Sequence, residues 1–406
     1  MPIKPFLLER YFARHEFSAP YLLSSSDCDG WALSEILSLA DSEARALWDG
    51  LRLGYTESTG LPALKREIAG LYAGIGPEQV LVSVPQEGIN LAMNALLKKG
   101  DHVVCTYPGY QSLYEIAESI GCEVDRWRPV ESEGWRFDVD QLARMIRPNT
   151  RLVIVNFPHN PTGALPSPGD FRRLVEIVSA RGIPLFSDEM YRLLELKEED
   201  RLPSACELYD KAIVLSGMSK AFGMAGARIG WLVAKDKAVL ERLAELKDYT
   251  TICSAAPSEV LALIGLRARE RILSRHRARI ARNLGLLDVF FEKHARTFSW
   301  ARPKAGTVGF PGLLTGEPPE EFCERAVHGA GVMLLPSTVY EYDRPHVRVG
   351  FGRENMPEAL SRLERFLDAR PDSQDGAHSA ASPGRTCSGT IRNEETASPS
   401  KSRTQA

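Results

Sequence analysis

A lysine and an arginine near the middle of the chain have a spacing that could support chemistry. The segment 216–220 reads SGMSK, and Arg228 lies eight residues beyond Lys220. An apolar, β-branched run precedes this segment and predicts a buried strand, so Lys220 leaves the expected sheet at its end. A guanidinium offers a fork of donors that matches phosphate geometry, and Ser219 adds a hydroxyl. A lysine after a strand is by itself usually a solvated loop residue, so the neighbouring motifs decide its meaning.

Two further motifs lie upstream, each at the end of an expected strand. Residues 156–163 read NFPHNPTG, and residues 187–191 read SDEMY. Taken alone, the first is ordinary turn chemistry and the second is typical of a helix N-terminus. In open α/β sheets, however, ligands bind beyond the carboxyl ends of the strands. We therefore expect both motifs to meet Lys220 at one edge of the sheet.

The elements that must position these motifs alternate along the chain. Short β-branched runs predict strands over 79–84, 102–106, 122–127, 152–156, 184–188, 212–216 and 229–234. Amphipathic stretches between them predict helices, among them 87–98, 110–120 and 171–180. This alternation is typical of an α/β protein with a largely parallel sheet. From about residue 240 to 370 we expect a long connecting helix followed by an α+β segment.

Composition sets limits on function. The 406 residues, 44% hydrophobic and 25% charged, are enough for two packed domains, and a net charge of -3 gives no electrostatic reason to expect nucleic acid or an anionic membrane as partner. Residues 1–12 lack the apolar run of a secretory signal, and no apolar stretch approaches the ~18 residues of a membrane span. We expect a cytoplasmic location. The seven scattered cysteines suggest reduced thiols, without disulfides or a metal site.

Together, the motifs that contain Asn160, Asp188 and Lys220 resemble those of the class I/II aminotransferases, the aspartate aminotransferase superfamily of pyridoxal 5'-phosphate (PLP) enzymes, over roughly residues 53–367. The resemblance implies PLP fold type I, in which a large domain holds a mostly parallel seven-stranded sheet between helices and a smaller domain is α+β. We expect an N-terminal arm with part of the small domain over 1–50 and the large PLP-binding domain over 51–250. The connecting helix and the C-terminal small domain should follow over 251–370, and a disordered polar tail over 371–406.

The resemblance also implies roles around the cofactor ring. Lys220 would hold PLP as a Schiff base and, once freed by the incoming amino acid, move a proton between Cα and the cofactor through a quinonoid intermediate. Asp188 would pair with the pyridine nitrogen and keep it protonated, so that the ring can accept electrons. Asn160 and Tyr191 would hydrogen-bond the phenolic oxygen, and Tyr110 would stack on the ring.

At the phosphate, the resemblance implies contacts from Arg228, Ser219 and the backbone N–H groups of Gln86 and Glu87 at a helix N-terminus. The sequence departs from the family here, because a Val-Pro pair occupies 84–85 where a Gly-Ala or Gly-Ser pair is usual. Proline donates no N–H, so one expected phosphate contact is absent or replaced, for example by the Gln86 side chain.

Two more positions match family elements. Tyr55 begins a Tyr-x-x-x-x-Gly-x-x-x-Leu pattern, which implies a tyrosine that reaches the phosphate of the other subunit in a homodimer with shared active sites; the alternative is a turn tyrosine before an amphipathic helix. Arg348, within HVRVGF at 346–351, matches the arginine that binds the substrate α-carboxylate, with Asn160 also near the substrate. On a strand, Arg348 points opposite to its two valine neighbours, either into a site or into water.

The implied activity is transamination between an amino acid and a 2-oxo acid. A dicarboxylate substrate is not supported, because DYTT at 248–251 has no arginine where dicarboxylate-specific members carry one. The segments 24–30, 85–88 and 334–337 also resemble the capreomycidine synthase-like branch, which uses PLP to eliminate a hydroxyl from an arginine derivative and close a ring. Elimination, replacement or cyclisation therefore stays open as an alternative.

A PLP-binding regulatory module is a remote third possibility. Such regulators carry a DNA-binding helix-turn-helix segment ahead of the aminotransferase-like part. Only some 50 residues precede Gly54, without a basic cluster, which favours an enzyme.

Overall fold

A computed structural model of the chain describes residues 3–369. The described residues up to Leu367 form one compact unit, so the expected subdivision at residues 50 and 250 stays a prediction. The expected polar tail at 371–406 lies outside the described residues.

A seven-stranded sheet forms the centre of the fold. Its order is β1-β7-β6-β5-β4-β2-β3, and all neighbours run parallel except β7, which is antiparallel to both β6 and β1. The strands span Val80–Ser83 (β1), His102–Thr106 (β2), Glu123–Trp127 (β3), Thr150–Asn156 (β4), Leu185–Asp188 (β5), Ala212–Gly217 (β6) and Gly230–Ala234 (β7). This confirms the predicted mostly parallel sheet of seven strands.

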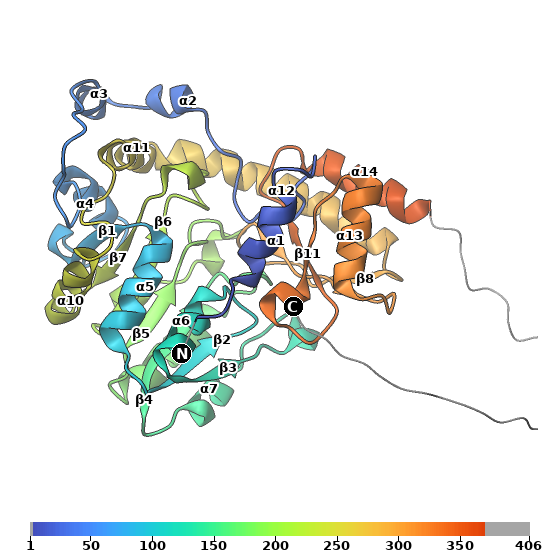
Figure 1. Ribbon diagram of the computed structural model, residues 1–406, viewed down its shortest axis with the longest axis horizontal. Coiled ribbons are helices and arrows are strands. Elements are labelled where there is room, and N and C mark those ends of the chain that lie inside the picture. Colours follow the sequence, from blue (N-terminus) through green and yellow to red (C-terminus); the bar gives the residue numbers. More distant parts are fainter. Residues whose placement is uncertain (1–2, 370–406) are drawn as a thin grey trace, which may run out of the picture. The chain divides into compact units, whose positions relative to one another are not determined.

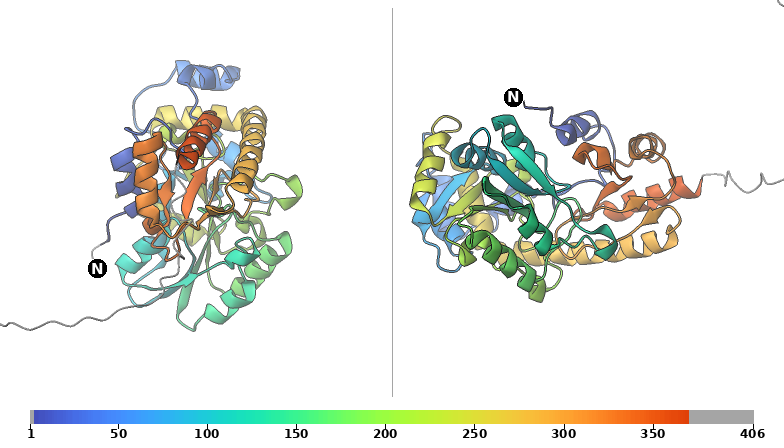
Figure 2. Two further views of the ribbon diagram at one scale, coloured as in Figure 1. Left: turned by 90° about the vertical axis from the view of Figure 1, so that its right-hand side faces the viewer. Right: turned by 90° about the horizontal axis from the view of Figure 1, so that it is seen from below.

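Burial explains why these runs become strands. Every residue of β1, β2, β5 and β7 is buried, as expected of a parallel sheet that is covered on both faces. Helices lie on both sides of it (Figure 1 and Figure 2). They are α4 (Pro62–Ala69), α5 (Pro85–Leu96), α6 (Ser112–Ile120), α7 (Val139–Met145), α8 (Pro168–Ser179), α9 (Ala205–Leu208), α10 (Lys237–Lys247) and α11 (Ala256–Arg267).

Two predicted helices begin earlier than expected, and proline is the reason. α5 begins at Pro85 and α8 at Pro168, each with proline in the first turn, where its missing N–H costs nothing. Ser167 caps α8 by accepting a 3.0 Å hydrogen bond from the Asp170 N–H.

Beyond α11, the 25-residue helix α12 (Arg269–Lys293) leads to a second group of elements (Figure 1). This group contains β8 (Phe298–Ser299), β9 (Val308–Gly309), β10 (Gly312–Leu313), α13 (Pro319–Ala330), β11 (Leu335–Pro336), β12 (Val347–Gly350) and α14 (Met356–Asp368). Strands β11, β12 and β9 form a three-stranded antiparallel sheet. The predicted long helix and α+β segment are confirmed.

The N-terminal residues join this second group. Tyr21 forms a bridge with Val332, and the Gly350 N–H donates a 2.7 Å hydrogen bond to the Leu23 carbonyl. The N-terminal helices are α1 (Leu7–His15), α2 (Leu33–Leu37) and α3 (Ser42–Asp49). Short 3₁₀ turns lie at Pro77–Gln79 (η1), Glu131–Glu133 (η2), Glu198–Asp200 (η3), Ala225–Ala227 (η4) and Ser337–Tyr340 (η5). None of the helices within residues 3–369 combines the length and apolar character of a membrane span.

Candidate active site

A cavity of about 370 Å³ lies where several strands of the large sheet end. All but two of the predicted site residues line it, and they come from distant parts of the chain: Gln86, Tyr110, Asn160, Asp188, Tyr191, Ser219, Lys220, Arg228 and Arg348. The other two, Glu87 and Tyr55, are not among its lining residues. The sheet thus brings the three sequence motifs together as the strand order requires.

Lys220 lies three residues beyond the end of β6, partly buried in the cavity wall. Its Nζ donates a 2.8 Å hydrogen bond to Ser26 Oγ and lies 6.0 Å from the centre of the Tyr191 ring. Burial lowers the pKa of this amine, since removal from water disfavours the charged form. Gly223 closes the turn with a φ of +65°, and a Cβ there would lie 2.6 Å from the Asp29 carbonyl oxygen. Only glycine suits that position without a shift of backbone.

Asp188 is the last residue of β5 and is buried. One carboxylate oxygen accepts a 3.1 Å hydrogen bond from the Met190 N–H, and its backbone carbonyl accepts one of 3.1 Å from Asn156 Nδ2. Burial raises the pKa of Asp188 to about 7, although the Met190 N–H and the charge of Lys220 act in the opposite direction. A carboxyl in this state is ready to pair with a positively charged group in the cavity.

Asn156 also fixes the loop that follows β4. Its Oδ1 accepts a 2.8 Å hydrogen bond from the Asn160 N–H. The Asn160 Oδ1 in turn accepts hydrogen bonds of 3.3 Å from Tyr340 Oη and from Arg348 Nη1. Tyr191 Oη is buried and has no hydrogen-bond partner within residues 3–369. The cavity therefore presents a buried hydroxyl whose hydrogen-bonding capacity a ligand could satisfy.

The first turn of α5 forms another wall. Its N–H groups at Gln86 and Glu87 lie ahead of the first intrahelical bond, which the Gly88 N–H donates to the Val84 carbonyl at 2.9 Å. The Gln86 side chain donates a 2.5 Å hydrogen bond to Ser112 Oγ. The Glu87 carboxylate instead accepts one of 2.8 Å from Thr251 Oγ1, which explains why Glu87 does not line the cavity.

The proline at the start of α5 has its own packing reason. A Cβ at Gly217 would lie 2.9 Å from Pro85 Cγ, and a Cβ at Gly230 would lie 2.7 Å from it. These paired glycines of β6 and β7 leave room for the pyrrolidine ring. Next to this wall, Arg228 adopts a left-handed φ of +49° and donates a 3.1 Å hydrogen bond to the Ala225 carbonyl.

Arg348 faces the cavity, which decides between the two orientations that its strand allowed. The residue is 1% exposed. Its Nε and Nη2 donate hydrogen bonds of 3.1 and 2.7 Å to the Ser24 carbonyl, and its Nη1 donates one of 2.7 Å to Tyr340 Oη. The Phe12 ring lies 5.8 Å from the guanidinium carbon. The arginine is thus held in place from three separate segments.

Tyr55 is 89% exposed and lies outside the cavity of its own chain. Leu53 and Tyr249 are similarly exposed, at 88% and 91%. The predicted role of Tyr55 at the site of a second subunit stays a prediction.

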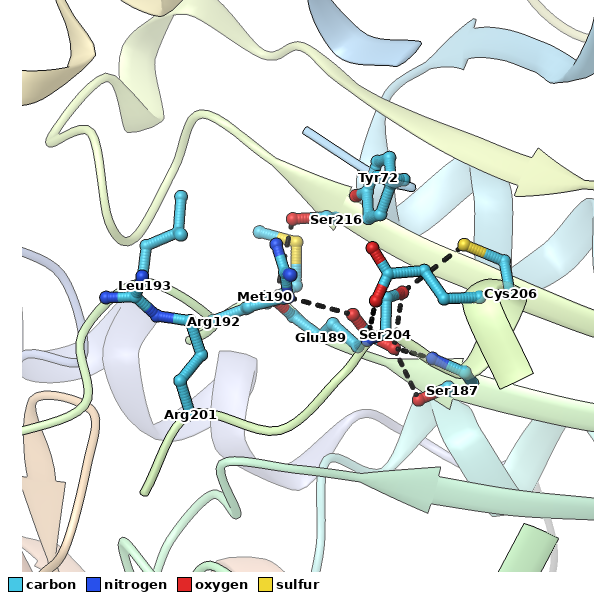
Figure 3. Close-up of polar contacts among 12 residues, drawn as sticks. Tyr72, Ser187, Glu189, Met190, Arg192, Leu193, Arg201, Ser204, Cys206 and Ser216 are labelled. Carbon is cyan, nitrogen blue, oxygen red and sulfur yellow. Dashed lines mark hydrogen bonds and ion pairs between the residues drawn. The ribbon is translucent and has the colours of Figure 1, made fainter. Parts of the chain in front are cut away.

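A buried carboxylate lies directly behind the site, at Glu189. Its Oε1 accepts hydrogen bonds from Ser187 Oγ, Ser204 Oγ and the Ala205 N–H at 3.1, 3.0 and 2.9 Å, and its Oε2 lies 3.7 Å from Arg192 Nε (Figure 3). The Glu189 N–H also donates a 2.8 Å hydrogen bond to the Leu215 carbonyl. This cluster fixes the chain immediately after Asp188.

The sequence did not indicate several residues that line the cavity or contact its lining. Ser26 and Tyr340 contact Lys220 and Arg348, and neither belongs to a recognisable local motif. Helix α1 contributes the lining residues Leu8, Glu9 and Phe12, and its C-cap contributes Glu16. The i, i+4 spacing within this set could have indicated a helix face turned to the interior, but not which interior it faces.

Comparisons with known proteins agree with this geometry. The family model described as aminotransferase class I and II matches residues 21–363. Capreomycidine synthase from Streptomyces vinaceus is 28% identical over 373 residues, covering 90% of this chain and 93% of that protein. The crystal structure of a PLP-dependent aminotransferase from Streptococcus suis 89-1591 superposes with a TM-score of 0.86 at 34% identity, covering 92% of this chain and all of that one.

A second solved structure, that of the PLP-dependent cyclase OrfR, has a TM-score of 0.82 at 29% identity and covers 91% of this chain and 99% of that one. The family match spans most of the sequence and includes every residue of the cavity that follows the N-terminal helix. The chain belongs to the class I and II aminotransferase family, whose fold type I it adopts, and its cofactor is PLP.

Proposed function

We propose that the protein is a PLP-dependent aminotransferase that acts on an amino acid other than a dicarboxylate and on a 2-oxo acid. One observation carries the proposal. A single cavity joins the amine of Lys220, the carboxyl of Asp188 and two guanidinium groups, those of Arg228 and Arg348. These are the groups that a phosphorylated aldehyde cofactor and an α-amino acid would require.

The residues present fit the cofactor. Lys220 would attach to its aldehyde, and Asp188 would lie at its ring nitrogen. Asn160 and the unpartnered Oη of Tyr191 would hydrogen-bond its phenolic oxygen. Tyr110, partly buried and close to the charge of Asp188, would cover the ring. When bound, PLP supplies an electron sink that stabilises negative charge on the substrate Cα.

The other end of the cavity would hold the phosphate. Arg228 and Ser219 line it there, and the free N–H groups of Gln86 and Glu87 lie at the N-terminus of α5. Since Pro85 has no N–H, the backbone at position 85 cannot donate a hydrogen bond to the phosphate. The contacts named above would have to hold the phosphate without it. The Gln86 amide is bonded to Ser112, which supports a structural role for that side chain.

The chain's own groups would then handle the substrate. Arg348 would bind the α-carboxylate. Lys220 would move the proton between the substrate Cα and the cofactor. Its lowered pKa keeps more of the amine unprotonated near neutral pH. Ser26 Oγ, 2.8 Å from Nζ, would hold the free amine between these steps.

The cationic groups of the cavity argue against a dicarboxylate. Among the cavity-lining residues of the described chain, the arginines are Arg228 and Arg348, and the phosphate and the α-carboxylate would occupy both. A second substrate carboxylate would find no further guanidinium among the described residues that line the cavity.

The likeness to capreomycidine synthase and to the cyclase OrfR supports a second candidate, PLP-dependent elimination, replacement or cyclisation. Both reactions begin with removal of the Cα proton, so the same residues would serve either of them. They differ in whether the substrate nitrogen stays on the cofactor.

We also propose a homodimer in which each subunit completes the other's site. The exposed Tyr55, beside the exposed Leu53, supports a contact with a second chain.

The test mixes the PLP-loaded protein with single amino acids in the absence of any 2-oxo acid. Transamination would shift the cofactor absorption band lastingly and release one 2-oxo acid per site without ammonia. Elimination or cyclisation would release ammonia or a cyclic product and restore the original band. If no visible band forms even with added PLP, the assignment of Lys220 is wrong.

A further inference from the structure

The hydroxyl of Tyr340 lies between two site residues that come from different sheets. Arg348 Nη1 donates a 2.7 Å hydrogen bond to Tyr340 Oη, and this Oη donates one of 3.3 Å to Asn160 Oδ1. Arg348 belongs to β12 of the three-stranded sheet, and Asn160 follows β4 of the large sheet. All three side chains are buried, so water does not compete for these bonds. The hydroxyl therefore joins the two sheets inside the site.

The backbone at Tyr340 is attached to both sheets as well. Tyr340 ends η5, which follows β11 directly, and β11 pairs with β12 so that Leu335 lies opposite Arg348. The next residue, Glu341, forms a 2.9 Å ion pair with Arg126 of β3 in the large sheet. The fold thus sets where the Tyr340 side chain starts from, on the side of each sheet.

The hydrogen bonds around Asn160 decide which way its amide points. Its Oδ1 accepts from Tyr340 Oη and from Arg348 Nη1, each at 3.3 Å. A guanidinium has only donors, so a reversed amide would set the Nδ2 donor against it. In the observed orientation, Nδ2 makes no hydrogen bond within residues 3–369. Because Asn160 lines the cavity, this donor is available to a ligand there.

Tyr340 also contacts the part of Arg348 that a carboxylate would need. The Nε and Nη2 groups of Arg348 both donate to the Ser24 carbonyl, at 3.1 and 2.7 Å. A carboxylate that binds this guanidinium in two places must therefore use the edge formed by Nη1 and Nη2. Since Tyr340 Oη accepts from Nη1, it holds one end of that edge.

We propose that Tyr340 is a positioning residue. Its hydroxyl would direct the Asn160 Nδ2 donor toward the phenolic oxygen of the cofactor and hold the Nη1–Nη2 edge of Arg348 toward the substrate carboxylate. The proposal rests on the proposed function, since it takes Asn160 and Arg348 as the groups that engage cofactor and substrate. The ring of Tyr340 packs edge-on against Phe310 with centroids 5.8 Å apart, a contact that phenylalanine would keep.

Tyr340→Phe tests the hydroxyl in the PLP-loaded full chain, through the pH dependence of the cofactor absorption band. We expect its midpoint to rise by about 0.4 to 1 pH unit, the effect of one hydrogen bond. An ionised phenolic oxygen that loses a well-placed donor holds the proton on the nitrogen that joins Lys220 to the cofactor more tightly. KM for the amino acid that the enzyme turns over best should rise about threefold to tenfold.

The matched control is Tyr342→Phe. This tyrosine lies two positions further along the same loop, and its hydroxyl makes no hydrogen bond within the described part of the chain. The substitution should change neither the midpoint of the band nor KM. A shift as large as that of Tyr340→Phe would show that the band reports general disturbance of the loop, and would overturn the proposal.

A second pair of variants separates positioning from packing. If Tyr340 acts on the cofactor through Asn160, Tyr340→Phe should no longer move the midpoint in an Asn160→Ala background. An equal shift in both backgrounds would overturn the proposal. Asn160→Asp keeps the oxygen that faces Tyr340 and Arg348 but removes the Nδ2 donor, so it should raise the midpoint at least as much. This measurement stands even if Tyr340→Phe does not fold, and an unchanged midpoint would contradict the orientation assigned to Asn160.

The two proposals fail in different ways. If the wild-type protein forms the cofactor band and turns over an amino acid, but Tyr340→Phe has the same midpoint and KM, only the inference about Tyr340 is wrong. If the wild-type protein forms no cofactor band, the proposed function is wrong and the inference about Tyr340 falls with it. Melting temperatures of the cofactor-free proteins show that the compared variants are folded.

Discussion

The Nζ of Lys220 lies 2.8 Å from Ser26 Oγ, so the loop after β6 and the segment between α1 and α2 meet at the reacting amine. The two residues are 194 positions apart. Ser24, two positions earlier, accepts two hydrogen bonds from Arg348 through its carbonyl. One short segment therefore holds both the amine that would carry the cofactor and the guanidinium that would bind the substrate.

Replacing Lys220 with alanine removes the amine to which the cofactor would attach and the base for the Cα proton. We expect the visible cofactor band to disappear and turnover to fall on the order of 10⁴-fold. Lys211→Ala, at an exposed lysine whose Nζ donates a hydrogen bond to the Gly182 carbonyl, is the control and should retain both. A Lys220→Ala protein with normal turnover would refute the assignment.

The cofactor-free protein should lose stability as pH rises, because of Asp188. Its pKa is about 7 in the folded state and about 3.9 when unfolded, so the unfolded chain gives up this proton first. The contribution to stability is therefore complete below about pH 4 and lost progressively up to about pH 7. Asp188→Asn has no proton to lose, so its free energy of unfolding should gain on the order of 2 kcal/mol relative to wild type between pH 5 and 7.

Denaturant unfolding of both cofactor-free proteins at several pH values measures this difference. Parallel pH dependences would show that Asp188 is already ionised in the folded state. With PLP bound, the same variant should lose turnover, because an amide cannot stabilise a protonated ring nitrogen.

Arg348→Lys keeps the charge but loses the fork that binds a carboxylate in two places. We expect KM for the amino acid to rise about tenfold to a hundredfold, since hydrogen bonds to charged groups contribute roughly 1.5–3 kcal/mol. Steady-state kinetics measure this change in KM. The matched control is Arg302→Lys, at an exposed arginine that pairs with Asp288. An unchanged KM would place the α-carboxylate elsewhere.

Mixed dimers test whether Tyr55 serves the neighbouring subunit. Tyr55→Ala and Lys220→Ala proteins should each have little activity. A dimer with one subunit of each kind contains one site with both an intact Tyr55 and an intact Lys220, so co-expression should recover a substantial share of wild-type activity. No recovery, in dimers shown to be mixed, would mean that Tyr55 acts within its own chain or not at all.

Glu189 should matter for stability through the donors that it satisfies. Glu189→Ala leaves the Ser204 hydroxyl and the Ala205 N–H without their buried acceptor, at a cost of about 1–3 kcal/mol for each unpaired group. We expect a melting temperature several degrees lower, with a smaller loss for Glu189→Gln, which retains an acceptor oxygen. Glu198→Ala, at an exposed glutamate, is the control. Equal melting temperatures would contradict the role of this cluster.

The strands and the central motifs could be predicted because their signals are local. The strand that ends at Asp188 is a buried apolar run, and the loops with Asn160 and Lys220 begin where such runs stop. The orientation of Arg348 needed the structure, since alternation along a strand leaves two faces open. Ser26 and Glu16 reach the cavity through tertiary packing of the N-terminal segment, and no nearby residue pattern encodes that placement.

The position of α1 has a consequence for engineering. Four residues of α1 and its C-cap, at positions 8, 9, 12 and 16, line the cavity, and they do so without belonging to the sheet that holds the reacting groups. Exchange of this helix between related enzymes would transplant a recognition surface and leave the machinery for bond breaking intact. Libraries randomised at positions 9, 12 and 16, with the buried Leu8 retained, would therefore explore new substrates without altering the sheet.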